Sequence, residues 1–221
     1  MQPATLAWTL CLLPLLSIHV CWLWSALVAA IPWCNPYWDG CVSISKAARS
    51  SDALFLFRGS MIFSAGYLVI FWQMVRMYLN RLAVPGNMPG IIAFIGSVGA
   101  IFLVLYADFL GTEGDLYRLL RRYGVIVYFT FTVLAQMLLW RALARQQPAA
   151  PWAPQQISLR LLLWSLFAIL VIGLLSLTAT LTLENPSKDR WENALEWWFA
   201  LLMTLNFGWL GRYWQQVKFN F

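Results

Sequence analysis

Six long apolar runs, separated by short polar turns, constrain this chain more than any other feature of its sequence. They occupy approximately residues 5–30, 54–78, 90–110, 120–142, 158–182 and 192–213. A run of about 18 or more apolar residues can cross the roughly 30 Å hydrocarbon core of a bilayer as a helix. A membrane β-barrel would need alternating segments of about ten residues, and that pattern is absent. The sequence therefore predicts an all-α bundle of six transmembrane helices, forming one domain over residues 1–221.

Composition agrees with a membrane location. The chain is 61% hydrophobic and 11% charged, whereas a soluble domain carries roughly 25% charged residues. The first residues, MQPATLAW, contain no Lys or Arg, so we expect a retained first helix rather than a cleaved signal peptide. The missing targeting peptide and the compact loops favour a bacterial inner membrane over an organelle membrane.

Charged residues are divided unevenly between the two sides of the predicted bundle. With the N-terminus in the cytoplasm, seven basic residues fall on the inner side and eight on the outer side, which gives no positive-inside bias. All nine acidic residues fall on the outer side: Asp39, Asp52, Asp108, Glu113, Asp115, Glu184, Asp189, Glu192 and Glu196. A purely basic face suits the anionic cytoplasmic leaflet. We therefore expect cytoplasmic N- and C-termini, membrane lipids as partners, and no nucleic-acid partner.

The stretch NPYWDGCVSISKAARSSDALFLFRG, residues 35–59, is unusually polar for this chain. It follows Cys34 and includes Cys41, which flank a turn and could form a disulfide in an oxidising compartment. Two unpaired thiols are an equally open alternative. Arg58 lies about one turn inside the second helix, where a bare arginine at mid-bilayer would cost roughly 2.5–3.5 kcal/mol. Its guanidinium therefore needs either the membrane interface or a carboxylate.

The charged outer face predicts a cleft that binds a lipid headgroup. Arginine forks suit a phosphate, and carboxylates suit hydroxyl groups or an amine. The competing interpretation is that these side chains pair with one another and join helix ends. The residues that we expect to bind the ligand are Asp39, Arg58, Asp108, Arg121, Arg122 and Glu196.

Metal and nucleophilic chemistry find little support in the sequence. The chain has one histidine, His19, which lies within the first helix and cannot build a three-histidine zinc site. A Ser-His-Asp triad would also need His19, which is far from the serines of the first loop. We predict no metal and no cofactor, leave catalytic residues unassigned, and favour a non-enzymatic protein while an enzyme stays an open alternative.

Three motifs resemble a known family of six-helix membrane proteins. They are NPYWDG after the first helix, LFRGSMIFSAGYL at the start of the second, and ENALEWWFALLMTLNF in the last. The family contains the DRAM autophagy modulators, the yeast Sfk-type proteins and the Frag-type proteins of GPI-anchor lipid remodelling. In it, the first motif would match Pro36, Tyr37 and Asp39. The second would match Arg58 with Gly59, and the third Glu196 with Trp197.

The resemblance implies cytoplasmic termini and a role in lipid handling, lipid distribution or support of lipid-modifying enzymes. One difference limits what it implies about chemistry. Many members carry a histidine where this chain has Arg121, three residues before Gly124. A proton-transfer role for that histidine therefore does not carry over.

We expect a non-enzymatic protein that binds a phospholipid or glycolipid headgroup in an exofacial charged cleft. An intramembrane lipid-remodelling acyltransferase or hydrolase, with Asp39 or Glu196 as base, is the first alternative. A scaffold subunit that works with another membrane protein is the second.

Overall fold

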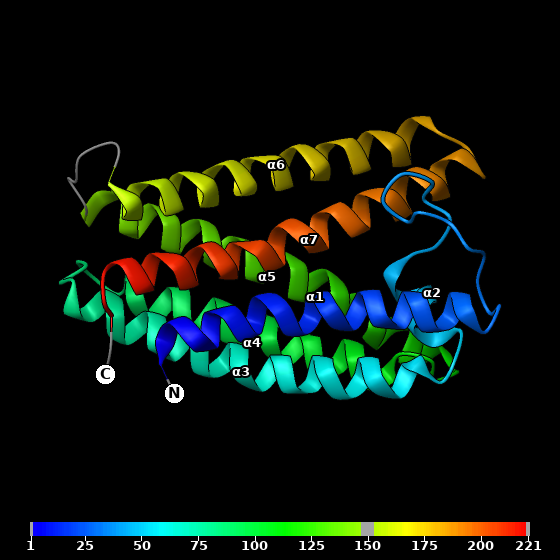
Figure 1. Cartoon of the computed structure of the whole chain (residues 1–221), viewed down its shortest axis with the longest axis horizontal. Coiled ribbons are helices and arrows are strands. Elements are labelled where there is room, and N and C mark those ends of the chain that lie inside the picture. The colour runs from blue at the N-terminus through cyan, green and yellow to red at the C-terminus, as the bar shows by residue number, and fades with distance from the viewer. Residues whose placement is uncertain (1, 147–152, 220–221) are drawn as a thin grey trace.

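The computed structural model describes residues 2–146 and 153–219, and these residues form an all-helical structure without strands. The predicted all-α class is therefore confirmed over the described residues. Their helices are α1 (Pro3–Leu27), α2 (Ile44–Arg49), α3 (Ala53–Arg81), α4 (Met88–Phe109), α5 (Asp115–Gln146), α6 (Pro154–Thr182) and α7 (Ser187–Gln216). Figure 1 shows the long helices running alongside one another.

Five of these helices, α1, α3, α4, α5 and α6, are long and apolar enough to cross a membrane. The chain is thus a multi-pass integral membrane protein by the length and composition of its helices. The remaining long helix, α7, has 30 residues, and its first turns carry charged side chains, including Glu192 and Glu196.

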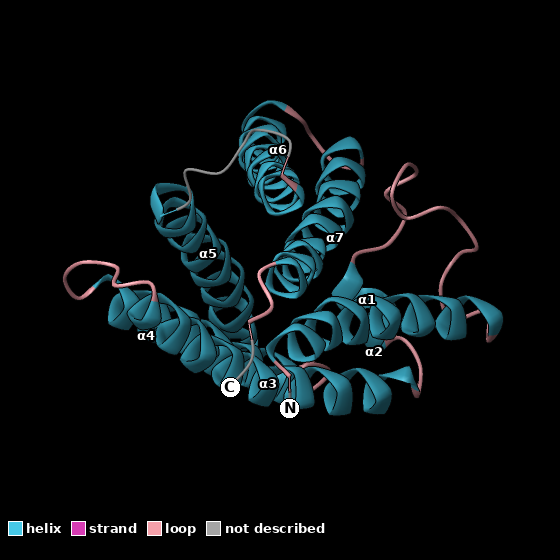
Figure 2. Cartoon of the chain, turned by 60° about the vertical axis from the view of Figure 1, so that its left-hand side comes forward, coloured by secondary structure: helices cyan, strands magenta, loops and turns pink. Residues whose placement is uncertain are grey.

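Each long helix packs against a small number of neighbours. α1 lies against both α3 and α7, α3 lies against α4, and α4 lies against α5. α6 packs mainly on α7 and touches α5 only slightly, so it forms the outer edge of the bundle in Figure 2. α5 consequently has little contact with α6 and α7, which leaves room between these helices.

Glycines allow the closest helix contacts. A Cβ atom at Gly96 on α4 would lie 2.3 Å from Cδ2 of Trp72, a fully buried side chain of α3. On α7, Gly208 and Gly211 face Trp8 of α1 in the same way. Helices in lipid gain stability from such close packing, because lipid tails are as apolar as the helix surfaces.

Uncharged polar side chains connect three helices inside the bundle. Asn206 of α7 donates to Oε1 of Gln136 on α5 at 2.8 Å, and Ser165 of α6 donates to Oδ1 of Asn206. Gln136 in turn donates to the carbonyl oxygen of Met203 at 3.1 Å. All of these side chains are buried, and their mutual hydrogen bonds offset the cost of removing them from water.

The two ends of the bundle differ in charge. α1 begins and α7 ends at one end (Figure 1), which we call the basic end. Its charged residues are Arg76, Arg81, Arg141, Arg145, Arg160, Arg212 and Lys218. The opposite end, which we call the mixed-charge end, contains α2 and all nine acidic residues.

The hydropathy pattern did not predict two features of the mixed-charge end. α2 is a six-residue helix, whose start is capped by Ser43, the acceptor of a 3.2 Å hydrogen bond from the Lys46 N–H. α5 begins at Asp115, five residues before the predicted start at residue 120. In both places apolar and polar residues are mixed over only five or six positions, so no long apolar run marks the helix.

We expect Gly96→Ala to destabilise the protein by about 1–3 kcal/mol, because the added methyl group overlaps the Trp72 ring and forces repacking. Gly66→Ala is the matched control. Gly66 lies on α3 with open space around its Cβ position, so alanine there should be neutral or stabilise by up to about 1 kcal/mol. Thermal unfolding in detergent measures both variants. Equal unfolding temperatures for the two would contradict the close α3–α4 contact.

Candidate functional site

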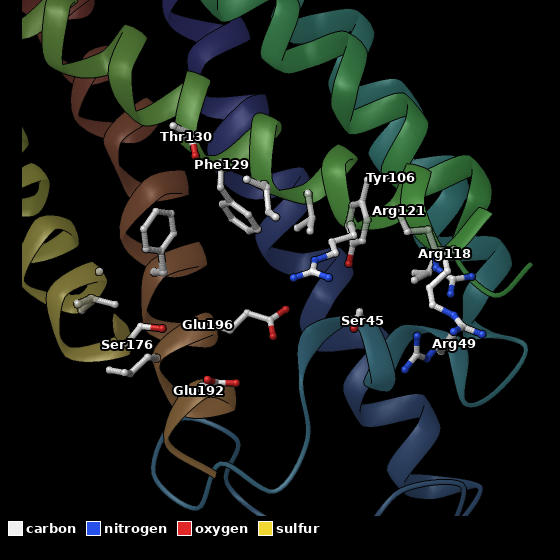
Figure 3. A pocket seen from close by; sticks show the side chains of 18 residues that line it. Ser45, Arg49, Tyr106, Arg118, Arg121, Phe129, Thr130, Ser176, Glu192 and Glu196 are labelled. Atoms are coloured by element: carbon white, nitrogen blue, oxygen red, sulfur yellow. The ribbon is translucent and has the colours of Figure 1, made fainter. Parts of the chain in front are cut away.

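A cleft of about 600 Å³ opens at the mixed-charge end, between α2, α4, α5, α6 and α7 (Figure 3). Arginines line one side of it and glutamates line the opposite side. Serine, tyrosine and threonine hydroxyl groups contribute further polar atoms. Its polar lining consists of Ser45, Arg49, Tyr106, Arg118, Arg121, Arg122, Thr130, Ser176, Glu192 and Glu196.

The cationic side is built by α2 and the start of α5. Arg49 is the last residue of α2, and Arg118, Arg121 and Arg122 lie on the first turns of α5. Arg121 donates to the carbonyl oxygens of Phe109, at 3.2 Å, and Thr112. These bonds fix its guanidinium against the end of α4, where helix carbonyls lack intrahelical partners.

A glycine sets the distance between α4 and α5 beside the cleft. A Cβ atom at Gly124 would lie 2.8 Å from the backbone nitrogen of Tyr106. This close contact brings the first turns of α5 against α4, one turn away from Arg121. Gly124 therefore allows the first turns of α5, which carry Arg121, to approach α4 closely.

The anionic side is carried by α7. Glu192 accepts a 2.7 Å hydrogen bond from the Thr180 hydroxyl, and its Oε1 lies 3.9 Å from Nζ of Lys188. Glu196 lies one helical turn further along α7, where the backbone N–H groups of Ile44 and Ser45 interact with its carboxylate. Figure 3 shows the carboxylates of Glu192 and Glu196 across the cleft from the arginines.

No ion pair joins the two sides of the cleft within residues 2–146 and 153–219. The ion pairs there are Arg118 with Asp115, at 3.6 Å, and Lys188 with Glu192, and each lies within one helix. The competing interpretation, in which the charged groups pair with one another, therefore gains no support from a cross-cleft ion pair. Opposite charges are held apart and face a common space.

The cleft continues as an apolar passage toward the middle of the bundle. Its walls there are Val125, Ile126 and Phe129 of α5, Ile172 of α6 and Phe199 of α7. These positions lie deeper along their helices than the charged residues. The site thus combines a charged mouth with an apolar interior, an arrangement that fits an amphipathic ligand.

A second hollow, of about 1010 Å³, lies where the α1–α2 loop meets the start of α7. A disulfide joins Cys34 to Cys41 within this loop. The indole of Trp197 donates to the carbonyl oxygen of Val42 at 2.9 Å, and that of Trp198 to the carbonyl oxygen of Tyr37 at 3.1 Å. The loop is therefore fixed on α7.

His19 supports the same loop. Its Nδ1 lies 2.7 Å from the carbonyl oxygen of Leu15, so Nδ1 carries the proton and donates to this oxygen. Nε2 then accepts a hydrogen bond from the Tyr37 hydroxyl at 2.9 Å. Burial raises the pKa of Tyr37 to about 12, so the phenol remains a donor at neutral pH.

Within the described residues, no group of three or more His, Cys, Asp or Glu side chains is placed to hold a metal ion.

The six residues predicted to bind a ligand do not all lie together. Arg121, Arg122 and Glu196 line the charged cleft. Asp39 lies at the second hollow, where its Oδ2 accepts a 2.8 Å hydrogen bond from the Asn35 N–H.

The other two residues lie near the end of α4, outside the cleft lining. Asp108 is exposed. Arg58 donates to the carbonyl oxygen of Leu110 at 3.1 Å and to the Thr112 hydroxyl at 3.2 Å. Its guanidinium is thus occupied by the α4–α5 turn.

The sequence-based prediction does not include seven polar residues of the cleft lining: Ser45, Arg49, Tyr106, Arg118, Thr130, Ser176 and Glu192. Ser45 and Arg49 belong to α2, whose only sequence signals are a capping serine and two alanines. Tyr106 stands in an apolar run and looks like a packing residue. Arg118 and Arg122 are four residues apart and share a helix face, and this spacing is the sequence signal for Arg118.

Comparison with known protein families, with characterised proteins and with solved structures found no match to this chain. The site is therefore interpreted from its own residues.

We expect Arg58→Met to destabilise the protein by about 1.5–3 kcal/mol, because the α4–α5 turn loses hydrogen bonds from a charged donor. Lipid retained after gentle purification should be unchanged. Unfolding in detergent and mass spectrometry of the bound lipid measure the two effects. Arg141→Met, at the exposed end of α5, is the control and should leave both unchanged. Lost lipid with unaltered stability would instead make Arg58 a ligand-binding residue.

Proposed function

We propose that this chain is a lipid-handling membrane protein that binds the headgroup of a phospholipid or glycolipid in the charged cleft, without catalysing a reaction. The single observation that carries the proposal is the convergence of four arginines at the mouth of a cavity with an apolar interior. Guanidinium groups form paired hydrogen bonds with phosphate oxygens, and their charge strengthens these bonds. A cavity of about 600 Å³ is within the usual range for small-molecule sites, roughly 300–1,000 Å³.

The acyl chains of such a lipid would follow the apolar passage between α5 and the α6–α7 pair. α5 has little contact with these two helices, and α6 is the outermost helix. Side chains that face the passage, including Ile126 and Ile172, are apolar. A lipid could therefore enter from the bilayer, with its headgroup staying at the polar mouth.

The proposed topology has six spans, with α7 as the sixth, and cytoplasmic termini. The basic end would then meet the anionic inner leaflet. The disulfide of Cys34 and Cys41 supports an exofacial position for the mixed-charge end, because disulfides persist in oxidising compartments. A bacterial inner membrane fits this arrangement. The resemblance to the DRAM, Sfk and Frag-type family belongs to the same proposal, since it implies lipid handling.

A lipid-remodelling hydrolase or acyltransferase is the second candidate. It is favoured by one observation, the presence of the Ser45 hydroxyl and the Glu196 carboxylate in the same cleft. Incubation of the purified protein with phospholipids, followed by analysis for lysolipid or transferred acyl chains, separates the two candidates. If the wild-type protein converts phospholipid and the Glu196→Gln variant does not, the protein is an enzyme.

We expect the double variant Arg49→Gln, Arg122→Gln to retain at least tenfold less phospholipid than the wild type. Each substitution removes a charge-assisted hydrogen bond to the phosphate, worth about 1.5–3 kcal/mol. A loss of about 1.4 kcal/mol corresponds to a tenfold loss of affinity. Native mass spectrometry after gentle purification measures the retained lipid.

The matched control is Arg76→Gln, Arg141→Gln. It removes the same charge from exposed positions near the basic end, so the retained lipid should not change. Equal lipid retention by both double variants would contradict headgroup binding in the cleft and favour a protein-scaffold role.

A further inference from the structure

We infer that the cleft selects a headgroup bearing both a phosphate and a primary ammonium group, of the phosphoethanolamine type. The phosphate would bind on the arginine side and the ammonium group at Glu196. This inference rests on the proposed function and specifies the ligand of the same site.

Glu196 is the carboxylate of the cleft that lacks a cationic partner. Glu192 has Lys188, with 3.9 Å between Oε1 and Nζ. Across the described part of the chain, no Lys or Arg nitrogen lies within 4.0 Å of a Glu196 carboxylate oxygen. Arg49 acts on it only through longer-range electrostatics. The negative charge of Glu196 is therefore incompletely compensated by the protein itself.

The surroundings of Glu196 make this charge costly. Leu195 is buried beside it, and Phe199 lies one turn further along the same helix and lines the cleft. The backbone N–H groups of Ile44 and Ser45 interact with the carboxylate, but they are neutral donors. Glu196 is half-buried, and an opposite charge close to its carboxylate would stabilise the charged form. A ligand ammonium group in the cavity would supply it.

The arginine side can bind an anion at the same time. Arg49 and Arg122 line the cleft and take part in no ion pair among the described residues. The Tyr106 hydroxyl lines the same cleft, within electrostatic range of Glu196, Arg49 and Arg121. A ligand whose phosphate and ammonium groups are joined by a short linker would reach both sides. A headgroup that is only anionic would leave Glu196 uncompensated.

A primary ammonium group fits Glu196 better than a quaternary one. It donates N–H hydrogen bonds to a carboxylate, whereas a trimethylammonium group has no donor. Quaternary ammonium groups are bound by cages of aromatic faces. The two phenylalanines of the cleft, Phe129 and Phe199, pack edge to face against each other with ring centroids 5.2 Å apart.

The inference is tested by measuring the binding of four lipids with identical acyl chains to the purified protein by native mass spectrometry. The lipids are phosphatidylethanolamine, its N-acetylated derivative, phosphatidylcholine and phosphatidylglycerol. We expect phosphatidylethanolamine to bind at least tenfold more tightly than each of the others. This comparison uses the wild-type protein, so it does not depend on whether a variant folds.

The variant Glu196→Gln keeps the shape of the side chain and removes its charge. We expect it to reduce the preference for phosphatidylethanolamine over the N-acetylated lipid at least fivefold. Glu113→Gln is the matched control, because Glu113 is an exposed carboxylate of the same end that does not line the cleft. It should leave the preference unchanged.

The outcomes separate this inference from the proposed function. Equal or tighter binding of phosphatidylglycerol or the N-acetylated lipid would overturn the ammonium requirement and leave headgroup binding intact. If none of the four lipids binds saturably, both the ammonium requirement and headgroup binding in the cleft are overturned. Competition by soluble glycerophosphoethanolamine at the concentration of the lipid would support the headgroup chemistry and overturn a membrane lipid as its source.

Discussion

The whole structure depends on the cost of placing charge in hydrocarbon. The apolar middle of the bundle uses uncharged polar groups, and Gln136, Asn206 and Ser165 satisfy one another there. Charged side chains are confined to the ends, where water and headgroups solvate them. All nine acidic residues lie at one of these ends. Selective recognition of a polar ligand that needs both signs of charge is therefore restricted to the mixed-charge end, and the basic end can only attract anionic groups.

Within the mixed-charge end, arginines serve two different purposes. Arg58 donates to the carbonyl oxygen of Leu110 and Arg121 to that of Phe109, both at the end of α4, where the last helix carbonyls lack intrahelical partners. Arg58 is occupied there, whereas Arg121 also lines the cleft. Arg49 and Arg122 line the cleft without capping a helix. The two groups of arginines differ in whether backbone carbonyl oxygens lie close to the guanidinium. A guanidinium that donates to carbonyl oxygens has fewer N–H donors left for a phosphate.

The helical class and the position of the charged residues follow from the sequence, because hydropathy and helix length are local properties. Arg122 and Glu196 could be assigned to one site because each stands at the charged start of an apolar run. Arg49 could not, since α2 has no apolar run and its position depends on the loop contacts of Trp197 and Trp198. The sequence predicts Asp39 at the cleft, but hydropathy does not encode the direction of a loop. In the structure its side chain closes a turn with Asn35.

The short helix α2 explains why opposite charges in the cleft remain unpaired. Its first residues, Ile44 and Ser45, present N–H groups to Glu196, while Arg49 at its other end lies on the arginine side. Six residues span about 9 Å along a helix axis, so α2 acts as a spacer between the two sides. The disulfide-closed loop before it is bonded to α7 and limits its movement. Collapse of the cleft into internal ion pairs would require α2 to leave this position. A ligand with two opposite charges can therefore compensate both sides without any rearrangement of the helices.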